Sequence, residues 1–229
     1  MSDTTTDHRS RTGALRRERT RRKLLESALA VFADKGIETS VIDDVIGAAG
    51  VSRGTFYNYF PSIRAAIIAA NHELGKEVFA LIEAEVSQIP DPAKRVAQGL
   101  LIFQETALAF PLFAHFVRAV GLEAAGQTSL LTDYLPTHLE DGMAQGRFSA
   151  LPMQAALDLI AGSTLVCLSR ALAAGADSTH RQQVIAATLR GLGLEADEAL
   201  KLAGAPASPL EPPVDSLLVK SHQRRGSEM

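Results

Sequence analysis

The residues of this sequence that are best suited to binding a charged partner lie in one short stretch, residues 52–60 (SRGTFYNYF). On a helix that begins at Arg53, the first turn offers free backbone N–H groups and the positive end of the helix dipole, both of which attract phosphate. Gly54 costs helix stability, but its bare Cα permits the close approach of a nucleic-acid backbone. The chemistry that this stretch indicates is therefore nucleic-acid binding rather than catalysis.

The aromatic residues of the same stretch divide between two faces of the helix. Phe56 and Phe60 are spaced i and i+4, so they share one face, which we expect to pack on the core. Tyr57 lies about 100° round the helix from Phe56. The residues expected to face outward are Thr55, Tyr57, Asn58 and Tyr59. The alternative is that the tyrosines only pack at the rim of the core.

A basic segment precedes this stretch. Between residues 9 and 23 the sequence carries eight basic residues against Glu18 alone: Arg9, Arg11, Arg16, Arg17, Arg19, Arg21, Arg22 and Lys23. Because the whole chain has a net charge of −3, this segment gives the molecule one end that suits a polyanion. The alternative is a solvated tail without a partner.

Patterns for other kinds of chemistry are incomplete. His72-Glu73 begins like H-E-x-x-H but lacks the second histidine, so we expect no zinc site of that kind. Gly191-x-Gly193 is not followed by a third glycine, and Cys167 lies in an apolar run where an inert thiol is expected. We therefore expect no catalytic residue, no metal site and no cofactor.

The composition indicates a soluble, cytoplasmic protein. A single cysteine excludes an internal disulfide and suits a reducing compartment. The first 23 residues are polar and rich in arginine, so we expect no signal peptide. The best candidate for a membrane span, residues 155–176, is interrupted by Asp158 and Arg170, which leaves a run too short to cross a bilayer.

The elements that must position these residues are predicted to be helices, since Ala, Leu and Glu outnumber strand-favouring residues; the fold class is all-α. A first helix is expected over residues 16–35. Ser40 and Asp43 form a helix start signal, and Ser52 caps the helix after the next turn. Residues 43–59 therefore have the pattern of a helix-turn-helix.

Proline and glycine divide the rest of the chain into longer helices, one of which we expect to kink or break at Pro136. The predicted ranges are 62–87, 92–110, 112–125, 129–145, 152–174, 178–194 and 195–204. The domain organisation that follows is a disordered basic arm (1–15), a helix-turn-helix domain (16–62), a larger helical body (63–204) and a disordered tail (205–229).

The residues of this helix-turn-helix resemble the DNA-binding domain of the TetR (tetracycline repressor) family. The similarity covers about residues 20–65 and is carried by Leu24-Leu25-x-x-Ala28…Phe32-x-x-x-Gly36 and by Val45-Ile46-x-x-Ala49-Gly50-Val51-Ser52-x-Gly54-Thr55-Phe56-Tyr57-x-Tyr59-Phe60. Members are mostly dimeric repressors of transcription that respond to a ligand. The resemblance implies the same function here, with double-stranded DNA as the partner.

The resemblance also implies how DNA is contacted. The third helix would enter the major groove, with its first residues near base edges and its two tyrosines on phosphates, and residues 9–17 would form an arm that reaches a minor groove or flanking phosphates. The expected DNA-binding residues are Ser52, Arg53, Gly54, Thr55, Tyr57, Asn58, Tyr59, Arg64, Arg17 and Ser40.

Three positions depart from the family pattern. Val41 stands where a threonine usually caps the second helix, and we expect Ser40 to cap it instead. Ile63 stands where a basic residue usually meets phosphate, and Arg64 is expected to replace it. Asp43 stands where some members read a base with arginine; its carboxylate would repel phosphate but could accept from cytosine N4.

A reader of palindromic DNA needs two recognition helices about 34–36 Å apart, or a multiple of that distance, which implies a homodimer. By analogy with the family, residues 152–174 and 178–194 would form the dimer interface; the alternative is an ordinary core within one chain. The fourth helix would transmit the effector signal to the DNA-binding domain.

By the same analogy, the larger body would hold an apolar pocket for a small effector, and its composition favours a hydrophobic or aromatic one. The expected ligand-binding residues are Phe103, Phe110, Phe113, Phe116, His115, His138, Met143 and Leu165, with Leu139 as a further apolar residue and Gln104, Thr106 and Arg118 as further polar ones. The alternative function is a DNA-binding protein of the same fold without a small ligand, acting architecturally or through a protein partner.

Overall fold

The computed structural model describes residues 4–124, 133–175 and 177–223, and every regular element within these ranges is a helix, which confirms the all-α prediction. The chain divides into an N-terminal unit that ends at Ala70 and a larger unit, Asn71–His222. We predicted this boundary within residues 62–74, with the helix-turn-helix domain ending at residue 62. Ala66, Ile67 and Ala70 in the first turns of the fourth helix are buried.

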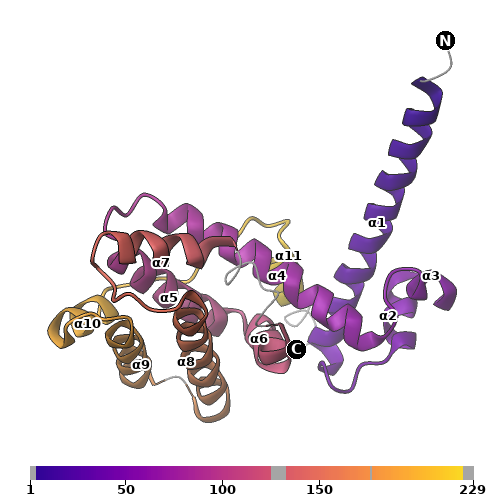
Figure 1. Cartoon of the computed structure of the whole chain (residues 1–229). Helices are drawn as coiled ribbons and strands as arrows, with labels where there is room; N and C mark the ends of the chain where they lie inside the picture. The colour runs from indigo at the N-terminus through magenta and orange to yellow at the C-terminus, as the bar shows by residue number, and fades with distance from the viewer. Residues whose placement is uncertain (1–3, 125–132, 176, 224–229) are drawn as a thin grey trace. The chain divides into compact units, whose positions relative to one another are not determined.

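Three helices and the start of a fourth form the N-terminal unit (Figure 1). They are α1 (Thr4–Lys35), α2 (Ile42–Ala49), α3 (Arg53–Tyr57) and α4 (Ile63–Val86), which continues into the larger unit. The apolar stripe of α1 enters the core, since Leu25, Ala28, Leu29 and Phe32 are each no more than 2% exposed. Gly36, with φ of 88°, ends α1 in a conformation that favours glycine.

The helix α1 is longer than predicted. It begins at Thr4, whereas we expected a disordered arm over residues 1–15 and a helix from about residue 16. The added turns contain no proline, and their arginines are strong helix formers. Residues 12–19 are exposed, so their helical conformation depends on backbone hydrogen bonds rather than on packing.

Within the described residues of the larger unit, six helices follow α4 before the C-terminal segment. They are α5 (Pro92–Ala109), α6 (Pro111–Ala124), α7 (Leu135–Ala144), α8 (Met153–Ala174), α9 (Ser178–Gly191) and α10 (Ala196–Ala203). Of the kink or break expected at Pro136, the structure shows no kink: α7 begins at Leu135, so this proline lies in the first turn of the helix, where its missing N–H breaks no helical bond. Residues 129–132 of the predicted helix lie outside the described residues.

The main core of the larger unit is one cluster of buried side chains from α5, α7, α8, α9 and α10. It includes Leu101, Leu139, Ile160, Leu189 and Ala199. The described part of α4 contributes no residue to this cluster. The helices α5, α7 and α8 therefore share a common packing that α4 borders.

Two loops of the larger unit meet at Gly193. The backbone N–H of Ser149 donates to the carbonyl of Leu192 at 2.8 Å, and Gly193 has φ of 108°. A Cβ at this position would lie 2.8 Å from the backbone nitrogen of Ser149. Only glycine therefore permits this approach of the α9–α10 turn to the segment before α8.

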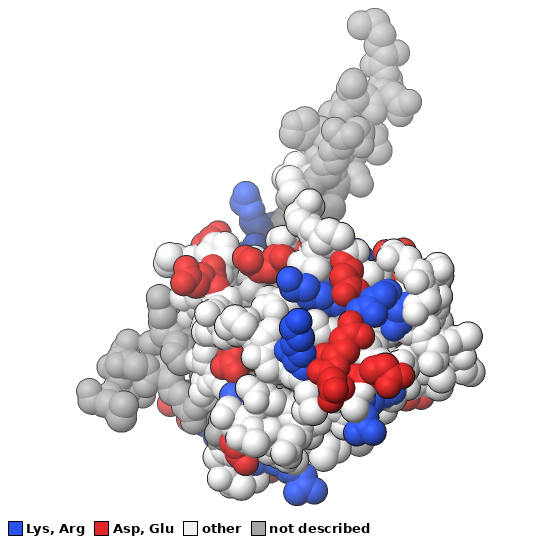
Figure 2. All heavy atoms as spheres, turned by 90° about the vertical axis from the view of Figure 1, so that its left-hand side faces the viewer, with Lys and Arg blue, Asp and Glu red and all other residues white. Residues whose placement is uncertain are grey.

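Ion pairs tie the ends of several helices together. Arg147 donates to both carboxylate oxygens of Asp91 (2.9 and 3.0 Å) and also pairs with Glu198 of α10. The Asp91 carboxylate in turn accepts from the N–H of Ala93 and caps α5. Basic and acidic side chains lie next to one another over the face of the molecule that Figure 2 shows, so this face has no large patch of one charge.

Residues 205–223 are ordered, which corrects this part of the predicted disordered tail (205–229); residues 224–229 lie outside the described residues. The described part includes α11 (Leu217–Gln223), and Leu210, Ser216, Leu217 and Leu218 are buried. The prediction was wrong because the many prolines and serines of the segment indicated an unpacked chain, while its few leucines are the residues that pack. We call residues 205–220 the C-terminal strap.

One helix, α8, is long and apolar enough to cross a membrane by length and composition alone. The core helix of a soluble protein can meet the same criteria. Only 39% of its most apolar stretch is buried within the chain. Much of α8 is therefore only partly covered by the described part of the chain, and Val166 is 55% exposed.

Candidate nucleic-acid interface and effector cavity

A tight turn joins α2 to α3 and determines where α3 begins. Gly50 takes the left-handed conformation (φ 59°) and ends α2, with N–H bonds to the carbonyls of the last turn. Ser52 then caps α3: its Oγ accepts from the backbone N–H of Thr55 at 3.1 Å and lies 2.9 Å from the Thr55 hydroxyl. The first turn of α3 is thereby held at the surface, as we predicted for the helix-turn-helix.

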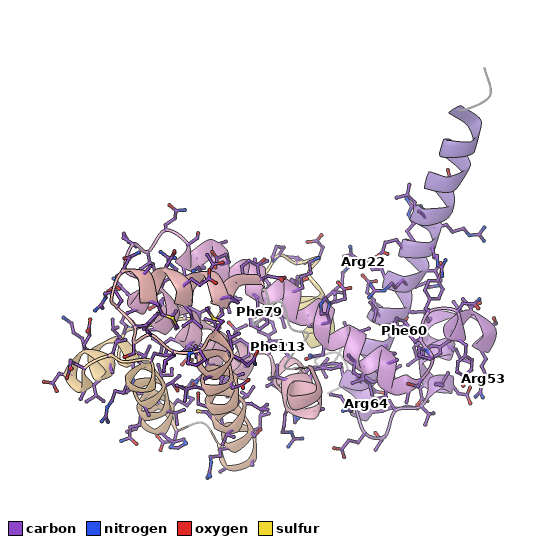
Figure 3. The ribbon with its side chains drawn as sticks, in the orientation of Figure 1. Arg22, Arg53, Phe60, Arg64, Phe79 and Phe113 are labelled. Atoms are coloured by element: carbon purple, nitrogen blue, oxygen red, sulfur yellow. The ribbon has the colours of Figure 1, made fainter. Side chains whose placement is uncertain are left out.

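The aromatic residues of this region divide between two faces as expected. Phe56 is 0% and Phe60 4% exposed, and their ring centroids lie 5.7 Å apart. Tyr57 is 48% exposed, and its ring lies edge-to-face with that of Phe56, with centroids 5.8 Å apart. Asn58 is exposed and Tyr59 is half-buried. Figure 3 shows Phe60 turned inward among the helices and Arg53 at the outer side of α3.

Acidic side chains hold two of the basic residues near this surface. Arg53 donates to Asp43 of α2, and this hydrogen bond raises the pKa of the guanidinium. Lys35 pairs with Asp44, and the same bond lowers the pKa of the Asp44 carboxyl. Both pairs are solvent-exposed, so each stabilises the fold little and can be exchanged for a phosphate contact.

The structure corrects the prediction for Ser40. This residue is 6% exposed, and its hydroxyl donates to the carbonyl of Gly36 at 2.6 Å instead of capping α2. The N-cap of α2 is Val41, whose backbone N–H donates to the Asp44 carboxylate at 3.1 Å. Ser40 therefore holds the α1–α2 turn and is not available at the surface.

The other expected DNA-binding residues lie at the surface of the N-terminal unit. Arg17 and Arg64 are exposed, while Ile63 is half-buried at the start of α4. Arg22, labelled with Arg64 in Figure 3, pairs with Glu26 of its own helix at 3.2 Å. The side chains of Arg9 and Arg11 lie outside the described part of the chain.

The larger unit contains a cavity of about 40 Å³ between α4, α5, α7 and α8. One side is aromatic. Phe79 and Phe103 stack with ring centroids 5.6 Å apart, and Phe113 and Phe103 lie edge-to-face with centroids 5.7 Å apart. Figure 3 shows Phe79 and Phe113 in this part of the unit. Ile82, Val86 and Leu135 are further apolar lining residues.

A hydrogen-bonded row of polar side chains forms the opposite part of the lining. Arg95 donates to His138 Nδ1 at 3.0 Å and to Asp141 at 3.2 Å. Because arginine can only donate, Nδ1 accepts and the proton of His138 resides on Nε2. That N–H donates to the Glu83 carboxylate at 2.7 Å. The row presents a fixed set of donors and acceptors beside an aromatic surface.

The structure brings only some of the predicted ligand-binding residues to this cavity. Phe103 and His138 line it, and Phe113 packs behind Phe103. The predicted residues that are not among its described lining are Phe110, Phe116, His115, Met143, Leu165, Leu139, Gln104, Thr106 and Arg118.

Three of those nine have other surroundings. Thr106 is fully buried, but its hydroxyl accepts from Leu210 of the C-terminal strap. Met143 packs against the main core cluster. Arg118 is exposed, and its guanidinium lies 3.5 Å from Nδ1 of His115 on the same helix.

Sequence reasoning missed the contribution of α4 to the cavity. Phe79, Ile82, Glu83 and Val86 line it and are spaced i, i+3, i+4 and i+7, which places them on one face. A glutamate within an otherwise apolar stripe was the available indication. Arg95, Tyr134 and Thr164 were missed as well, because their proximity depends on packing between helices.

The exposed first turn of α3 over a buried Phe56–Phe60 pair defines a helix-turn-helix DNA-binding domain. Residues 24–70 match the family model "Bacterial regulatory proteins, tetR family", and residues 91–204 match the model "Tetracyclin repressor-like, C-terminal domain". The chain belongs to the TetR family of transcriptional regulators.

Curated relatives share the N-terminal part of this similarity. The HTH-type transcriptional regulator EthR of Mycolicibacterium smegmatis is 33% identical over 84 residues, which are 34% of this chain and 39% of EthR. The HTH-type transcriptional repressor LfrR of the same organism is 31% identical over 88 residues, 37% of this chain and 46% of LfrR. The chain thus spans less than half the length of these relatives.

Solved structures match over most of the chain. RolR in complex with the ligand resorcinol superimposes with a TM-score of 0.75 at 28% identity, covering 86% of this chain and all of RolR. RolR without ligand gives a TM-score of 0.71 at 26% identity, covering 81% of this chain and 97% of RolR. The similarity includes both the DNA-binding and the C-terminal helical domain.

Proposed function

We propose that this regulator is a dimeric, cytoplasmic repressor that binds a palindromic operator and is released from it by a small aromatic effector. The DNA-binding function is supported by the two different faces of α3, one buried and one accessible. Phe56 and Phe60 fasten this helix to the core, while Arg53, Thr55 and Tyr57 stay accessible. With Gly54 and Asn58, this surface suits a major groove.

The dimer is supported by the incomplete burial of α8. Val166 is 55% exposed on this apolar helix, and Gly162, Ser163 and Leu165 are only partly buried. An apolar helix face of this length is stable in water when a second surface covers it. We assign that surface to α8 and α9 of a second copy of the chain, in agreement with the interface expected at residues 152–174 and 178–194.

The effector class is supported by the lining of the cavity. A planar ring can pack against the stacked Phe79–Phe103 pair, and a ring hydroxyl can both donate to the Glu83 carboxylate and accept from Arg95. A hydroxylated aromatic compound fulfils both conditions, and RolR, the relative of known structure, was solved with resorcinol. We therefore propose a phenolic effector bound against the row Arg95–His138–Glu83.

Selection of genomic DNA fragments by the purified protein tests the DNA-binding function. We expect one palindromic sequence to be enriched, with half-sites about one or two helical turns apart. The genes beside the enriched site would then indicate the class of effector. Binding without any preferred sequence would contradict the proposal.

Titration of the protein–operator complex with benzene, phenol, resorcinol and benzoate tests the effector class. Phenol and resorcinol should release the DNA at lower concentration than benzene, which has no hydroxyl, and than benzoate, whose charge meets Glu83. His138→Leu should reduce the response roughly tenfold or more, because it breaks the polar row. His72→Leu, a matched change at an exposed site of α4, should not.

The alternative function, DNA binding without a small ligand, is favoured by one observation. A cavity of about 40 Å³ is smaller than the roughly 150 Å³ that holds benzene in an engineered protein core. Native mass spectrometry of the purified dimer separates the alternatives. A co-purified small molecule supports the inducible repressor, while an empty dimer that no phenol binds supports the ligand-free regulator.

A further inference from the structure

We propose that the C-terminal strap, residues 205–220, restrains α4 from behind and so limits how far the effector cavity can open. The strap lies outside the two segments that match the family models, residues 24–70 and 91–204. This inference rests on the proposed function only where it concerns the effector. The restraint of α4 follows from contacts within the larger unit.

Three hydrogen-bonded attachments hold the strap to α4 and α5. The Glu77 carboxylate accepts from the backbone N–H groups of Leu217 and Leu218, at 3.0 and 3.1 Å. The hydroxyl of Thr106 accepts from the N–H of Leu210 at 3.0 Å. The third attachment joins the side-chain amide of Gln98 to the carbonyl of Pro206 at 3.3 Å.

Burial adds to these attachments. Leu218 is 0% exposed and Leu210 and Leu217 are each 9% exposed, so the strap is packed as well as hydrogen-bonded. Figure 1 shows α11 beside α4. Because both oxygens of Glu77 are used, the N-terminus of α11 is fixed to one point on α4.

The strap and the cavity lie on opposite sides of α4. The residues of α4 that contact the strap or face the groove beneath it are Glu77, Leu81, Ala84 and Glu85. The residues that line the cavity are Phe79, Ile82, Glu83 and Val86. At about 100° per residue, the centres of these two sets differ by roughly 165° round the helix. The middle of α4 is therefore enclosed between the cavity and the strap.

Entry of an aromatic ring requires the cavity to enlarge, since its volume of about 40 Å³ is well below the roughly 150 Å³ that benzene occupies in a protein core. The walls from α5, α7 and α8 share the main core cluster, to which the described part of α4 contributes no residue. Displacement of those three helices would disrupt that cluster. The wall that moves at least cost is α4.

A displacement of α4 away from the cavity would press it against the strap. The groove of about 420 Å³ beneath Pro206–Glu211 leaves room for the movement of Leu81 and Ala84, while the Glu77 and Thr106 attachments resist it. The strap thus sets the stiffness of the helix that continues into the N-terminal unit.

Hydrogen–deuterium exchange of the unliganded protein tests the restraint. We compare the full chain with a chain that ends at Ala205 and with the Glu77→Gln variant. In this variant one carboxylate oxygen is replaced by an NH₂ group, so one of the two backbone N–H groups of α11 loses its acceptor. Amides of residues 77–86 should exchange roughly tenfold faster in the shortened chain and a few-fold faster in Glu77→Gln. Val214→Ser, at a strap position that is 78% exposed, is the matched control and should exchange like the full chain.

Unchanged exchange of α4 in a shortened chain whose α5 and α8 amides stay protected would overturn the proposal. If amides of the whole shortened chain lose protection, Glu77→Gln is compared with Val214→Ser instead. Equal exchange of α4 in these two variants would then overturn the proposal. Phenol is then titrated into the full and shortened chains by calorimetry, with at least fivefold tighter binding expected in the shortened chain. Equal affinity would refute the link to the cavity, and binding to neither would refute the effector class while the exchange result still stands.

Discussion

Phe56 and Tyr57 are neighbours in the chain, yet the fold gives them opposite surroundings. Phe56 is fully buried beside Phe60, whereas Tyr57 is 48% exposed. The cause is the rotation of about 100° between successive helical residues, together with the Ser52 cap that determines where α3 begins. Two adjacent aromatic residues can therefore be separated by mutation into a structural and a binding contribution.

We predict that Tyr57→Phe weakens operator binding roughly tenfold and leaves folding unchanged, because it removes one hydroxyl that can donate to phosphate. Phe56→Ala should destabilise the N-terminal unit by about 3–5 kcal/mol through loss of a buried ring. Fluorescence anisotropy with labelled operator and thermal unfolding measure the two effects. Normal operator binding by Tyr57→Phe would show that this hydroxyl makes no phosphate contact.

Asp43 and Asp44 show how the same residue type acts differently at neighbouring positions. Asp44 accepts from the backbone N–H of Val41 and from Lys35, which stabilises the start of α2. Asp43 pairs with Arg53 across the turn and is 64% exposed at its side chain. Because one nitrogen of the Arg53 guanidinium is bonded to Asp43, we expect Asp43 to compete with DNA for this side chain.

At the scale of the element, the extension of α1 changes how the basic segment can act. Residues 12–19 are helical and exposed, so their arginines project from a rod rather than from a flexible arm. We still expect residues 9–17 to contact flanking phosphates, because they carry Arg9, Arg11, Arg16 and Arg17.

Deletion of residues 1–14 removes Arg9 and Arg11. Each lost phosphate contact should reduce the slope of log K against log salt by about 1, so we predict a slope shallower by about 2. Deletion of residues 1–8, which contain no Lys or Arg, is the control and should leave the slope as it is. If the deletion of residues 1–14 gives the same slope as the full chain, Arg9 and Arg11 make no phosphate contact and the proposed arm is wrong.

The attachment of Arg147 to Asp91 connects α5, the α7–α8 loop and α10. Its hydrogen bonds hold the pKa of the Asp91 carboxyl below the ordinary value. A carboxyl with a lowered folded-state pKa adds stability that is fully present above its unfolded pKa, about 3.9, and is lost as the pH falls through the folded pKa.

We therefore predict that Arg147→Gln lowers the free energy of unfolding at pH 7, and that its difference from the parent protein decreases below about pH 4. Urea unfolding at pH 7 and at pH 3 measures this. Lys94→Gln removes one positive charge from an exposed site on α5 and serves as the control. A difference that is the same at both pH values would show that Arg147 acts through packing rather than through charge.

At the scale of the whole molecule, we propose that a second copy of the chain covers the partly exposed apolar residues of α8. We predict that Val166→Glu converts the dimer to a monomer and weakens operator binding roughly 100-fold, because the two recognition helices no longer act together. Leu200→Glu is a closely matched control, since Leu200 is also 55% exposed but lies on α10. Sedimentation velocity and operator binding measure the outcome; a dimeric Val166→Glu protein would place the interface elsewhere.

The helices and the recognition surface could be predicted from the sequence because their determinants are local. Gly50, Ser52 and the Phe56–Phe60 spacing lie within eleven positions of one another, and each acts on its own turn of helix. Most of the predicted helix boundaries were indicated by proline, which likewise acts on its own turn of helix. Pro136 indicated either a kink or a break, and the choice between the two depends on whether a helix has already begun, which neighbouring residues did not show.

The cavity could be predicted only in part, since its lining comes from four helices. Phe103 and His138 were expected there, but Glu83 and Arg95 were not, and Thr106 was assigned to the wrong surface. Whether a buried polar side chain faces a cavity or a neighbouring segment depends on the relative rotation of packed helices. Helical periodicity gives the face of each helix but not its partner.

By itself, the sequence determined an all-helical regulator with a DNA-binding α3, because helix starts, helix ends and side-chain faces follow from residues a few positions apart. Only the tertiary structure decided that Ser40 is buried, that His138 joins Glu83 and Arg95, and that the C-terminal strap is held to α4. The Glu77–Leu217 bond joins residues 140 positions apart. Contacts over such distances in the chain depend on the packing of the whole unit, which no local pattern contains.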